Sequence, residues 1–411
     1  MKTLFIHQNF PGQFRHLAPW LAAQPGHEVV CVGQRDDPPL PGTVQWRYQP
    51  KRMPGAATHH YLRGMEAAVL NGQAVLELLL KLKTQGFVPD VIVAHPAWGE
   101  SLYAKLAYPD VPLVHYCEFF YQLEGADVGF DPEAPMSIDQ RARLVTRNAL
   151  HLLNLQQCDL GVTPTHWQKS VHPLEYQPKL EVLHEGVDTA AARPDGHASF
   201  ALPDGRVLTK QHKVVTFVAR NLEPYRGFPQ FLRALAQVQQ ADAQVQALVI
   251  GGDGVSYGSP PQGAANWREH LVPGSGIDPQ RTHFLGRLPH AQYLQALQVS
   301  SLHVYLTYPF VLSWSLLEAM ACGAPVMASR TAPVQEVIDD GRNGRLVDFF
   351  DAEAQARCML AMLHDPAAQR ALSEAAAATV AQRYSAHAGC AQWQALLRRV
   401  TQRFLFAHCV D

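Results

Sequence analysis

The sequence predicts an α/β protein with two domains, each built on a parallel sheet. Three observations support this prediction. The chain has 411 residues, which is too long for one hydrophobic core and suits two domains. Short apolar runs of strand type alternate along the chain with longer runs of helical spacing. The first of these units, a strand over 3–6, a loop ending at Gly12 and a helix over 13–23, is typical of the start of a nucleotide-binding α/β domain.

The composition argues against several classes of protein. Lysine and arginine total 34 and aspartate and glutamate total 36, so the net charge of −2 gives no field that attracts nucleic acid or an anionic membrane. The seven cysteines include no Cys-x-x-Cys pair, which argues against a disulfide framework and a zinc site. The N-terminal apolar run is too short for a signal peptide, and no run approaches the ~18 apolar residues of a membrane span. We therefore expect a cytoplasmic protein with no metal site.

The first half of the chain reads as alternating strands and helices. Its strands are short runs rich in valine, isoleucine and leucine, and its first long helix carries leucines at helical spacing. Strands are expected at 27–32, 90–95, 112–115, 159–162 and 180–183, and helices at 61–86, 140–157 and 164–171. The polar and aromatic segment 119–139 is long for a loop. It either shapes an acceptor pocket or packs over the surface, and both readings stay open.

Polar side chains gather where the strands of this half end. His7, His95 and His115 follow or close three strands, and Glu118 comes shortly after the third. Ligands of open parallel sheets bind outside the carboxyl ends of the strands, so we expect these four side chains along one rim. The alternative for each histidine is a loop residue that bonds to nearby backbone.

A shift in composition marks the domain boundary. Residues 189–205 are rich in alanine, proline, aspartate and glycine, so we place the boundary there, with a first domain over 1–188 and a second over 189–386. Alanine-rich helices at 352–363 and 367–382 precede a last, amphipathic helix over 387–406. The apolar face of that helix carries Trp393, Leu396, Leu397, Val400 and Phe404.

The second half repeats the strand–turn–helix order. Strand 213–219 runs into a loop with Arg220 and Arg226, and a helix follows over 228–239. Arginines at the carboxyl end of a strand suit phosphate oxygens, because one guanidinium donates two parallel hydrogen bonds. They are equally well explained as partners of an acidic neighbour such as Glu223.

A glycine-rich turn follows the next strand of this half. Strand 247–250 runs into Gly251-Gly252-Asp253-Gly254, where the missing side chains let backbone N–H groups approach an anion. Any tight turn has a similar sequence, so this signal is weak alone. Further strands are expected at 283–288 and 302–306, with a helix over 291–297 between them.

The segment 307–329 reads as a strand end, a loop, a helix and another strand. Ser313 or Ser315 can cap the helix, and Gly323 can end it. The helix is apolar nearly all round except for Glu318, whose carboxylate is costly to bury without a fixed hydrogen-bond partner. Either Glu318 lies on one wet face, or it meets a ligand about one turn from a helix start that receives an anion.

Taken in order, these motifs resemble the donor-binding half of the retaining GT-B glycosyltransferases of family 4 (group 1). The motifs are the two arginines before Gly227, the Gly-Gly-Asp-Gly turn, Leu285-Gly286-Arg287 and the segment 309–329. In the first half, the loop ending at Gly12, the strand ending at His115 and the segment 184–188 resemble the acceptor half. The resemblance implies two facing Rossmann-like domains with a cleft between them, and a C-terminal helix over 387–411 that crosses back to the first domain.

The resemblance also implies roles for individual residues. Arg220 and Arg226 would be the catalytic counter-charge on the diphosphate, and His115 would lie near the transferred sugar. Glu318 would bind the ribose hydroxyls. The other donor-binding residues that the resemblance implies are Gly12, Gly252, Asp253, Gly254, Arg287, Leu288, Phe310, Leu312 and Ser313.

The chain departs from the family pattern at two points. Where the family has a glutamate facing the hydroxyls of the donor sugar, this chain has Phe310, which offers an apolar face. Either the donor sugar is less hydroxylated there, for example a deoxysugar, or other groups make the contact, or the protein is inactive. The arginines are also one residue further apart than in the family, which more often has lysine at the position of Arg226.

The implied reaction is a retaining sugar transfer from a nucleoside-diphosphate sugar to a hydroxyl of a glycan, a lipid-linked or cell-envelope precursor, or a small molecule. The chain has no Asp-x-Asp motif, so we expect no cofactor and no metal ion, with the arginines as the counter-charge. We expect a same-face substitution in which the diphosphate takes the acceptor proton. A sugar-nucleotide epimerase and a non-catalytic sugar-nucleotide-binding partner are the open alternatives. Nucleic acid is not expected as a partner, and peripheral contact with the inner face of the membrane is left open.

Overall fold

The computed structural model describes residues 1–408, with side chains to residue 404, and this part of the chain forms two compact α/β units. Unit 1 consists of Met1–Gly186 and Ala386–Asp411, and unit 2 consists of Val187–Ser385. The sequence analysis placed these limits at 188 and 386. Residues 409–411 of the expected last helix lie outside the described residues.

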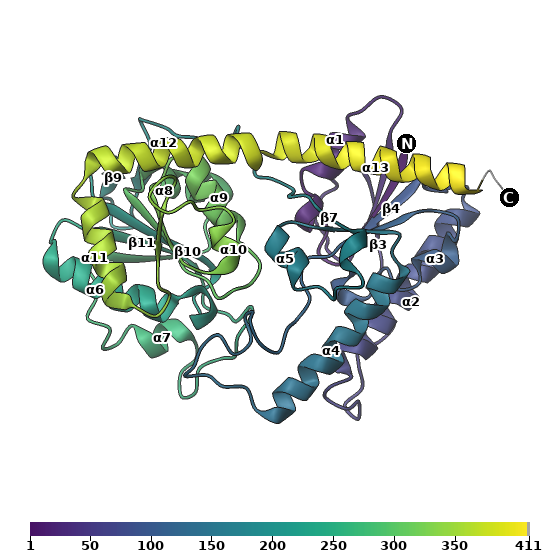
Figure 1. The fold of residues 1–411 in the computed structure, drawn as a ribbon, viewed down its shortest axis with the longest axis horizontal. Coiled ribbons are helices and arrows are strands. Elements are labelled where there is room, and N and C mark those ends of the chain that lie inside the picture. Colours follow the sequence, from purple (N-terminus) through teal and green to yellow (C-terminus); the bar gives the residue numbers. More distant parts are fainter. Residues whose placement is uncertain (409–411) are drawn as a thin grey trace. The chain divides into compact units, whose positions relative to one another are not determined.

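Unit 1 contains a seven-stranded parallel sheet with the strand order β3-β2-β1-β4-β5-β6-β7 (Figure 1). Its strands are β1 Lys2–Ile6, β2 Glu28–Gly33, β3 Val44–Arg47, β4 Val91–Ala94, β5 Leu113–Tyr116, β6 Leu160–Thr163 and β7 Leu180–Val182. Its helices are α1 Leu17–Ala22, α2 Arg63–Thr84, α3 Ala104–Ala107, α4 Ile138–Gln157, α5 His166–Ser170 and α13 Ala386–His408. The strand order turns back on itself between β1 and β4, as in doubly wound α/β sheets.

Apolar layers cover both faces of this sheet, because successive strand side chains point to opposite faces. Phe5 packs on one face with Trp393 of α13, and Leu4 packs on the other with Val75 and Leu79 of α2. The expected apolar face of the last helix is confirmed within the described side chains. Trp393, Leu396 and Leu397 are buried, and Val400 and Phe404 are half-buried.

Unit 2 contains a six-stranded parallel sheet with the strand order β12-β11-β10-β13-β14-β15 (Figure 1). Its strands are β10 Val214–Asn221, β11 Gln246–Gly252, β12 Thr282–Gly286, β13 Leu302–Tyr305, β14 Val326–Ser329 and β15 Arg345–Val347, and β8 Ser199–Ala201 pairs with β9 Val207–Thr209 in a separate antiparallel ribbon. Its helices are α6 Phe228–Ala241, α7 Trp267–Leu271, α8 His290–Val299, α9 Trp314–Ala321, α10 Ala332–Gln335, α11 Ala352–Leu363 and α12 Pro366–Arg383. The order again turns back on itself, here between β10 and β13.

The segment where we placed the domain boundary is folded into unit 2. It contains β8, and its Ala192, Ala198, Phe200 and Leu202 side chains are buried in the core of that unit. Its alanine, proline and glycine content is typical of a linker, but small side chains also pack closely. The chain passes between the two units earlier, between residues 186 and 187.

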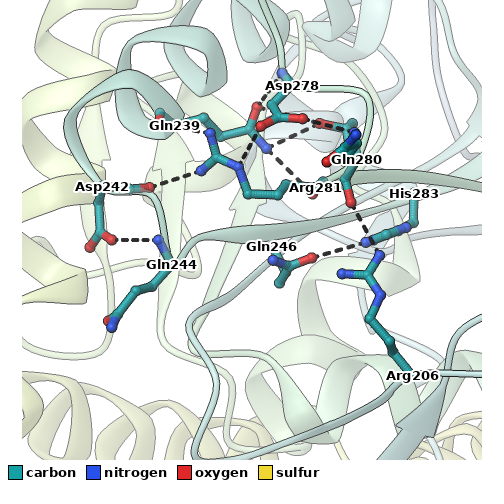
Figure 2. Close-up of polar contacts among 10 residues, drawn as sticks. Arg206, Gln239, Asp242, Gln244, Gln246, Asp278, Gln280, Arg281 and His283 are labelled. Carbon is teal, nitrogen blue, oxygen red and sulfur yellow. Dashed lines mark hydrogen bonds and ion pairs between the residues drawn. The ribbon is translucent and has the colours of Figure 1, made fainter.

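A polar cluster holds the amino edge of the unit 2 sheet (Figure 2). Arg281 lies just before β12 and donates to two carbonyl oxygens at the end of α6, those of Gln239 (3.0 Å) and Asp242 (3.0 Å). Its Nε also donates to Asp278 Oδ2 (2.7 Å). A cation on the last carbonyls of a helix satisfies acceptors that have no partner within the helix. This cluster is therefore structural, at the end of the sheet opposite the candidate site.

Candidate active site

The candidate site residues lie after strands at or next to the point where each sheet turns back on itself. This point lies between β1 and β4 in unit 1, and between β10 and β13 in unit 2. Open parallel sheets bind ligands outside the carboxyl ends of their strands at this point, because the loops diverge there and leave a crevice. Most of the predicted site residues lie in unit 2.

The two predicted arginines after β10 have different environments. Arg220, near the end of β10, is exposed. Arg226 is only 6 % exposed, and its Nη1 donates to Thr307 Oγ1 (2.7 Å) and Val311 O (3.2 Å). Its guanidinium also lies over the Tyr257 ring, 5.0 Å from the centroid. Arg226 therefore fastens the loop after β13 and puts a buried positive charge beside it.

Glu223, the alternative partner of these arginines, is engaged elsewhere. Its carboxylate is fully buried and accepts the backbone N–H groups of Ser256, Tyr257 and Gly258 at distances of 3.1 to 3.4 Å. In the described residues neither arginine forms an ion pair with it. Glu223 instead clamps the loop after β11, a role that the sequence analysis missed.

Asn221, the last residue of β10, organises the glycine turn. Its Nδ2 donates to Ser256 Oγ (2.6 Å), and its Oδ1 accepts from Arg287 Nη2 (3.2 Å). A Cβ on Gly252 would lie 2.7 Å from Asn221 Oδ1 and 2.8 Å from Arg287 Nε. Only glycine therefore allows Asn221 and Arg287 to approach this turn so closely.

The other predicted residues near this turn divide into two groups. Gly254 also flanks Asn221, since a Cβ there would lie 3.3 Å from Oδ1. The Asp253 carboxylate pairs with Arg268 (2.7 Å), and Leu288 packs against the core of unit 2. The structure thus brings Gly252, Gly254 and Arg287 together, while Asp253 and Leu288 make other contacts.

Helix α9 begins and ends as predicted. Ser313 is its N-cap and accepts the Ser315 N–H (3.3 Å), and Gly323, with a φ of +73°, follows its last turn. The Ser313 N–H donates to Tyr305 Oη (2.8 Å), which also accepts from Arg226 Nη1 (3.4 Å). The backbone N–H of Ser313, one of the residues predicted to bind the donor, is therefore bonded within the protein.

The Glu318 carboxylate is held by the neighbouring helix α8. Only 12 % of its side chain is exposed. Tyr293 Oη donates to Oε2 (2.8 Å), and His290 Nε2 lies 3.1 Å from Oε1. The wet-face interpretation is wrong, because the carboxylate has the fixed partners that burial requires. Each oxygen can still accept a second hydrogen bond, so the contact with ribose stays a prediction.

Phe310 lies in an aromatic cluster beside α9. Its ring is edge-on to Tyr225 (5.3 Å between centroids) and Tyr257 (5.2 Å). Tyr225 also stacks on Tyr308 at 4.8 Å. Phe310 and Leu312 are both buried. The position where the resembled family has glutamate is therefore part of an apolar wall.

In unit 1, three of the four expected rim residues come together. His7 Nε2 lies 2.8 Å from Gln13 Oε1, and Gln13 Nε2 donates to Glu118 Oε1 (2.7 Å). His95 Nε2 lies 3.5 Å from Glu118 Oε2, and the two imidazole rings are 4.9 Å apart. Gly12 has a φ of +46°, and a Cβ there would lie 2.3 Å from His7 Nε2. Glycine thus lets the loop after β1 rest against the His7 ring.

His115 does not belong to this cluster. It lies within β5, which continues to Tyr116, and it is fully buried beside the Cys158 thiol. Neither of its ring nitrogens has a hydrogen-bond partner among the described residues. The expectation that His115 stands on the rim is wrong, because the apolar strand continues past it. Glu118, two residues beyond the strand, occupies the edge instead.

Burial and hydrogen bonding set the charges of the unit 1 cluster. Burial, together with the nearby His95, lowers the pKa of His7 to about 3, so its ring is neutral near pH 7. Burial alone would raise the pKa of Glu118, but the nearby His95 ring, the hydrogen bond from Gln13 and the nearby His7 ring outweigh it and lower that pKa. Burial raises the pKa of the nearby Glu100 carboxyl to about 7, and Tyr48 donates a hydrogen bond to it. The sequence analysis missed Gln13 and Glu100.

Among the described side chains, which extend to residue 404, no group of three or more histidine, cysteine, aspartate or glutamate residues is arranged to hold a metal ion. Over the same range, the structure contains no helix with the length and apolar character needed to cross a membrane. The cations that follow β10 and β12 are the side chains of Arg220, Arg226 and Arg287.

Two family models match the chain. The glycosyl transferase family 4 group matches residues 25–192, and the glycosyl transferases group 1 matches residues 212–365. The chain belongs to the family 4, group 1 glycosyltransferases. Its two Rossmann-like units are those of the GT-B fold, and its function is sugar transfer.

Several curated relatives of the chain are D-inositol 3-phosphate glycosyltransferases. The D-inositol 3-phosphate glycosyltransferase of Segniliparus rotundus is 25 % identical over 377 residues, covering 88 % of this chain and 75 % of the relative. Enzymes of the same name from Mycolicibacterium paratuberculosis and Mycobacterium marinum are each 28 % identical over 66 % and 67 % of this chain. The matches span only 58 % and 56 % of the lengths of those two relatives.

Solved structures with the same fold cover nearly the whole chain. Sucrose-phosphate synthase from Thermosynechococcus elongatus has a TM-score of 0.70 at 19 % identity, over 99 % of this chain and 100 % of its own. HepE of Anabaena, solved in complex with UDP and glucose, has a TM-score of 0.69 at 18 % identity, over 97 % of this chain and 99 % of its own. At these identities the likeness establishes the fold.

Proposed function

We propose that this chain is a retaining glycosyltransferase that transfers a sugar from a nucleoside-diphosphate sugar, held by unit 2, to an acceptor hydroxyl. One observation carries this proposal. Arg287 and the Gly252–Gly254 turn converge on Asn221 at the carboxyl edge of the unit 2 sheet, next to Arg220. Cations and closely approached backbone at this edge suit a diphosphate.

The arginines supply the counter-charge for bond breaking. When the sugar–phosphate bond breaks, negative charge develops on the leaving diphosphate. Donors that are already in place stabilise this charge without reorganising, which is the largest contribution in many such reactions. Arg220 and Arg287 are exposed to a ligand, and Arg226 adds a buried positive charge. We assign the acceptor proton to a diphosphate oxygen, on the face that the leaving group departs from.

Two further observations reduce the range of candidate donor sugars. HepE, which shares this fold, was solved with UDP, and this supports a UDP-sugar as the first candidate. Phe310 presents a ring where the resembled family has glutamate, and its aromatic neighbours keep that wall apolar. We propose that the donor sugar presents few hydroxyls to this wall, as a deoxysugar would. The acceptor is proposed to be a polyol, a sugar or a glycan.

A thermal-shift screen of nucleotide sugars tests the proposal. A ligand that binds only the folded chain raises the melting temperature in proportion to the logarithm of its concentration over Kd. We expect UDP-sugars to raise it more than GDP- or ADP-sugars, and Arg220→Ala to weaken the shift. A screen in which no nucleotide sugar stabilises the full-length chain would overturn the proposal. Product analysis with the best donor then separates transfer from epimerisation.

A further inference from the structure

The hydrogen bonds around Glu118 run in one direction. The Asn9 N–H donates to His7 Nδ1 (2.9 Å), so the neutral His7 ring carries its proton on Nε2. That nitrogen donates to Gln13 Oε1 (2.8 Å) and thereby orients the Gln13 amide. The amide nitrogen of Gln13 then donates to Glu118 Oε1 (2.7 Å). Every donor in this chain is uncharged, and the carboxylate oxygen Oε1 is fixed.

His95 approaches the other oxygen of Glu118 without completing a hydrogen bond. The Ala97 N–H points to His95 Nδ1 (3.4 Å), so the proton of the ring lies on Nε2. This nitrogen is 3.5 Å from Glu118 Oε2. The ring is only 2 % exposed, and yet its Nε2 has no hydrogen-bond partner among the described residues. Buried donors are nearly always paired in native proteins, so this one indicates a missing partner.

The missing partner has to satisfy two groups of opposite character. It must accept a proton from His95 Nε2 and donate one to Glu118 Oε2. A hydroxyl does both with one oxygen. A phosphate or carboxylate oxygen has no proton for Glu118 and adds a second negative charge, and an ammonium group has no lone pair for His95.

We infer that His95 Nε2 and Glu118 Oε2 together bind one hydroxyl of a substrate sugar or polyol at the carboxyl edge of the unit 1 sheet. This inference rests on the proposed function and adds a subsite to it. The Glu118 side chain is 29 % exposed, so a ligand can reach this oxygen. Gln13 and His7 act through Glu118, by holding its other oxygen in place.

Glu118 positions the hydroxyl and does not remove its proton. A carboxylate with a lowered pKa is a weak base for an alcohol. It can still fix the direction of the O–H bond, which turns a lone pair of the oxygen away from the protein.

The hydroxyl can come from the sugar of the donor or from the acceptor, and one set of measurements distinguishes the two. The full-length wild type and Glu118→Gln are titrated calorimetrically with UDP and with UDP-glucose, and the KM of myo-inositol as acceptor is measured. With Gln13 bonded to the amide oxygen, the amide nitrogen of Glu118→Gln faces His95 and offers the hydroxyl no acceptor. We expect about a tenfold loss either in the affinity for UDP-glucose or in the apparent affinity for myo-inositol, seen as a rise in its KM.

If the hydroxyl belongs to the donor sugar, the affinity for UDP-glucose falls and the affinity for UDP is unchanged. If it belongs to the acceptor, both affinities are unchanged and the KM of myo-inositol rises. Either result supports the inference, since a merely structural role would not separate these readouts. Glu118→Asp keeps the charge and withdraws the carboxylate by one methylene, so it should show the same selective loss.

Glu124→Gln is the matched control, because Glu124 lies in the same loop, is exposed and pairs only with Arg141 in the described residues. The inference is overturned if Glu118→Gln behaves like Glu124→Gln in all three measurements, including the case in which myo-inositol gives no turnover. It is also overturned if the affinities for UDP and UDP-glucose fall equally. Failure of UDP and of every nucleotide sugar to bind the wild type would instead count against the proposed function.

Discussion

Glu318 is fixed by the protein before any ligand binds. Tyr293 and His290 each meet one of its oxygens, at 2.8 and 3.1 Å, so the carboxylate is already oriented on α9. Orientation of this kind lowers the entropy that a ligand loses on binding. A ribose diol needs two acceptors with a fixed spacing, and a held carboxylate offers them. The contacts with α8 are therefore compatible with the predicted role.

We predict that Glu318→Gln weakens nucleotide binding by about 1–3 kcal/mol, because an amide has one oxygen where the carboxylate has two. The loss should be equal for UDP and UDP-glucose, since the proposed contact is with ribose and not with the sugar. Calorimetric titration with both ligands measures it. Tyr293→Phe is the control, because it removes a partner of Glu318 and keeps the carboxylate. If Glu318→Gln binds UDP as tightly as the wild type, the nucleotide is not held by α9.

The site residues that the sequence revealed are those whose chemical type is unusual for their element. Glu318 is the acid of an apolar helix, and the Gly252 turn breaks a strand, so both could be picked out before the structure was known. Asn221 and Glu223 look like ordinary loop residues, and their roles depend on a loop more than 30 positions away in the chain. Both residues lie at or just after the end of a strand. The sequence analysis used this position as a sign of ligand binding for the arginines but not for Asn221 and Glu223.

At the level of elements, the hydrophobic pattern located strands and helices well and their ends less well. The strand that was expected to close at His115 continues to Tyr116. That small difference decides whether His115 is a site residue. A residue inside a strand packs against a covering layer, whereas a residue beyond the strand lies at the carboxyl edge of the sheet. His115 is buried for this reason, and Glu118 meets His95. Tertiary packing determines where a strand ends, and the local sequence pattern carries no information about that packing.

The two edges of the unit 2 sheet have different roles, ligand binding at the carboxyl edge and stability at the amino edge. The carboxyl edge carries the exposed arginines and the glycine turn, and the amino edge carries the cluster around Arg281 (Figure 2). Arg281 joins the end of α6 to the start of β12 through two hydrogen bonds of 3.0 Å, and its Nε donates to Asp278 at 2.7 Å. Stability and ligand binding should therefore respond separately to substitutions at the two edges.

We predict that Arg281→Met lowers the free energy of unfolding by about 1–3 kcal/mol, because it leaves carbonyls at the end of α6 without a partner. The affinity for UDP should stay within about twofold of the wild type, since the cluster is at the far edge of the sheet. Chemical denaturation and calorimetric titration measure the two effects. A large loss of UDP affinity in a variant of unchanged stability would contradict this separation.

Across the whole molecule, both sheets turn back on themselves in the same way. The side chains at their carboxyl edges, however, carry different charges. Unit 2 presents Arg220 and Arg287 after its strands, with Arg226 buried nearby. The cluster of unit 1 has the ionised Glu118 and the neutral His7 ring. A cationic edge is suited to a diphosphate and a carboxylate edge to hydroxyls. Shared topology thus explains the fold, and the side chains at the carboxyl ends of the strands explain the different ligands proposed for the two units.

This distribution of charge predicts that sugar transfer needs no metal ion. Nucleoside diphosphates commonly carry Mg²⁺ to neutralise the charge that develops on the leaving group. Here the side chains of Arg220, Arg226 and Arg287 can supply that charge from the ends of β10 and β12 and the loops that follow. Turnover in EDTA should therefore stay within about twofold of turnover in Mg²⁺. Loss of transfer in EDTA that Mg²⁺ restores would contradict the prediction.

Arg220→Ala tests directly whether an arginine, and not a metal ion, supplies the charge opposite the diphosphate. Loss of one donor to the transition state should lower kcat by about 10²-fold. Added Mg²⁺ should not restore it, because the chain is expected to hold no ion beside the diphosphate. Arg206→Ala is the matched control, since Arg206 is an exposed arginine of the same unit that pairs with Asp204 near the amino edge of the sheet. Its kcat should equal that of the wild type. Equal losses in the two variants would mean that net charge, and not the place of Arg220 after β10, controls the rate.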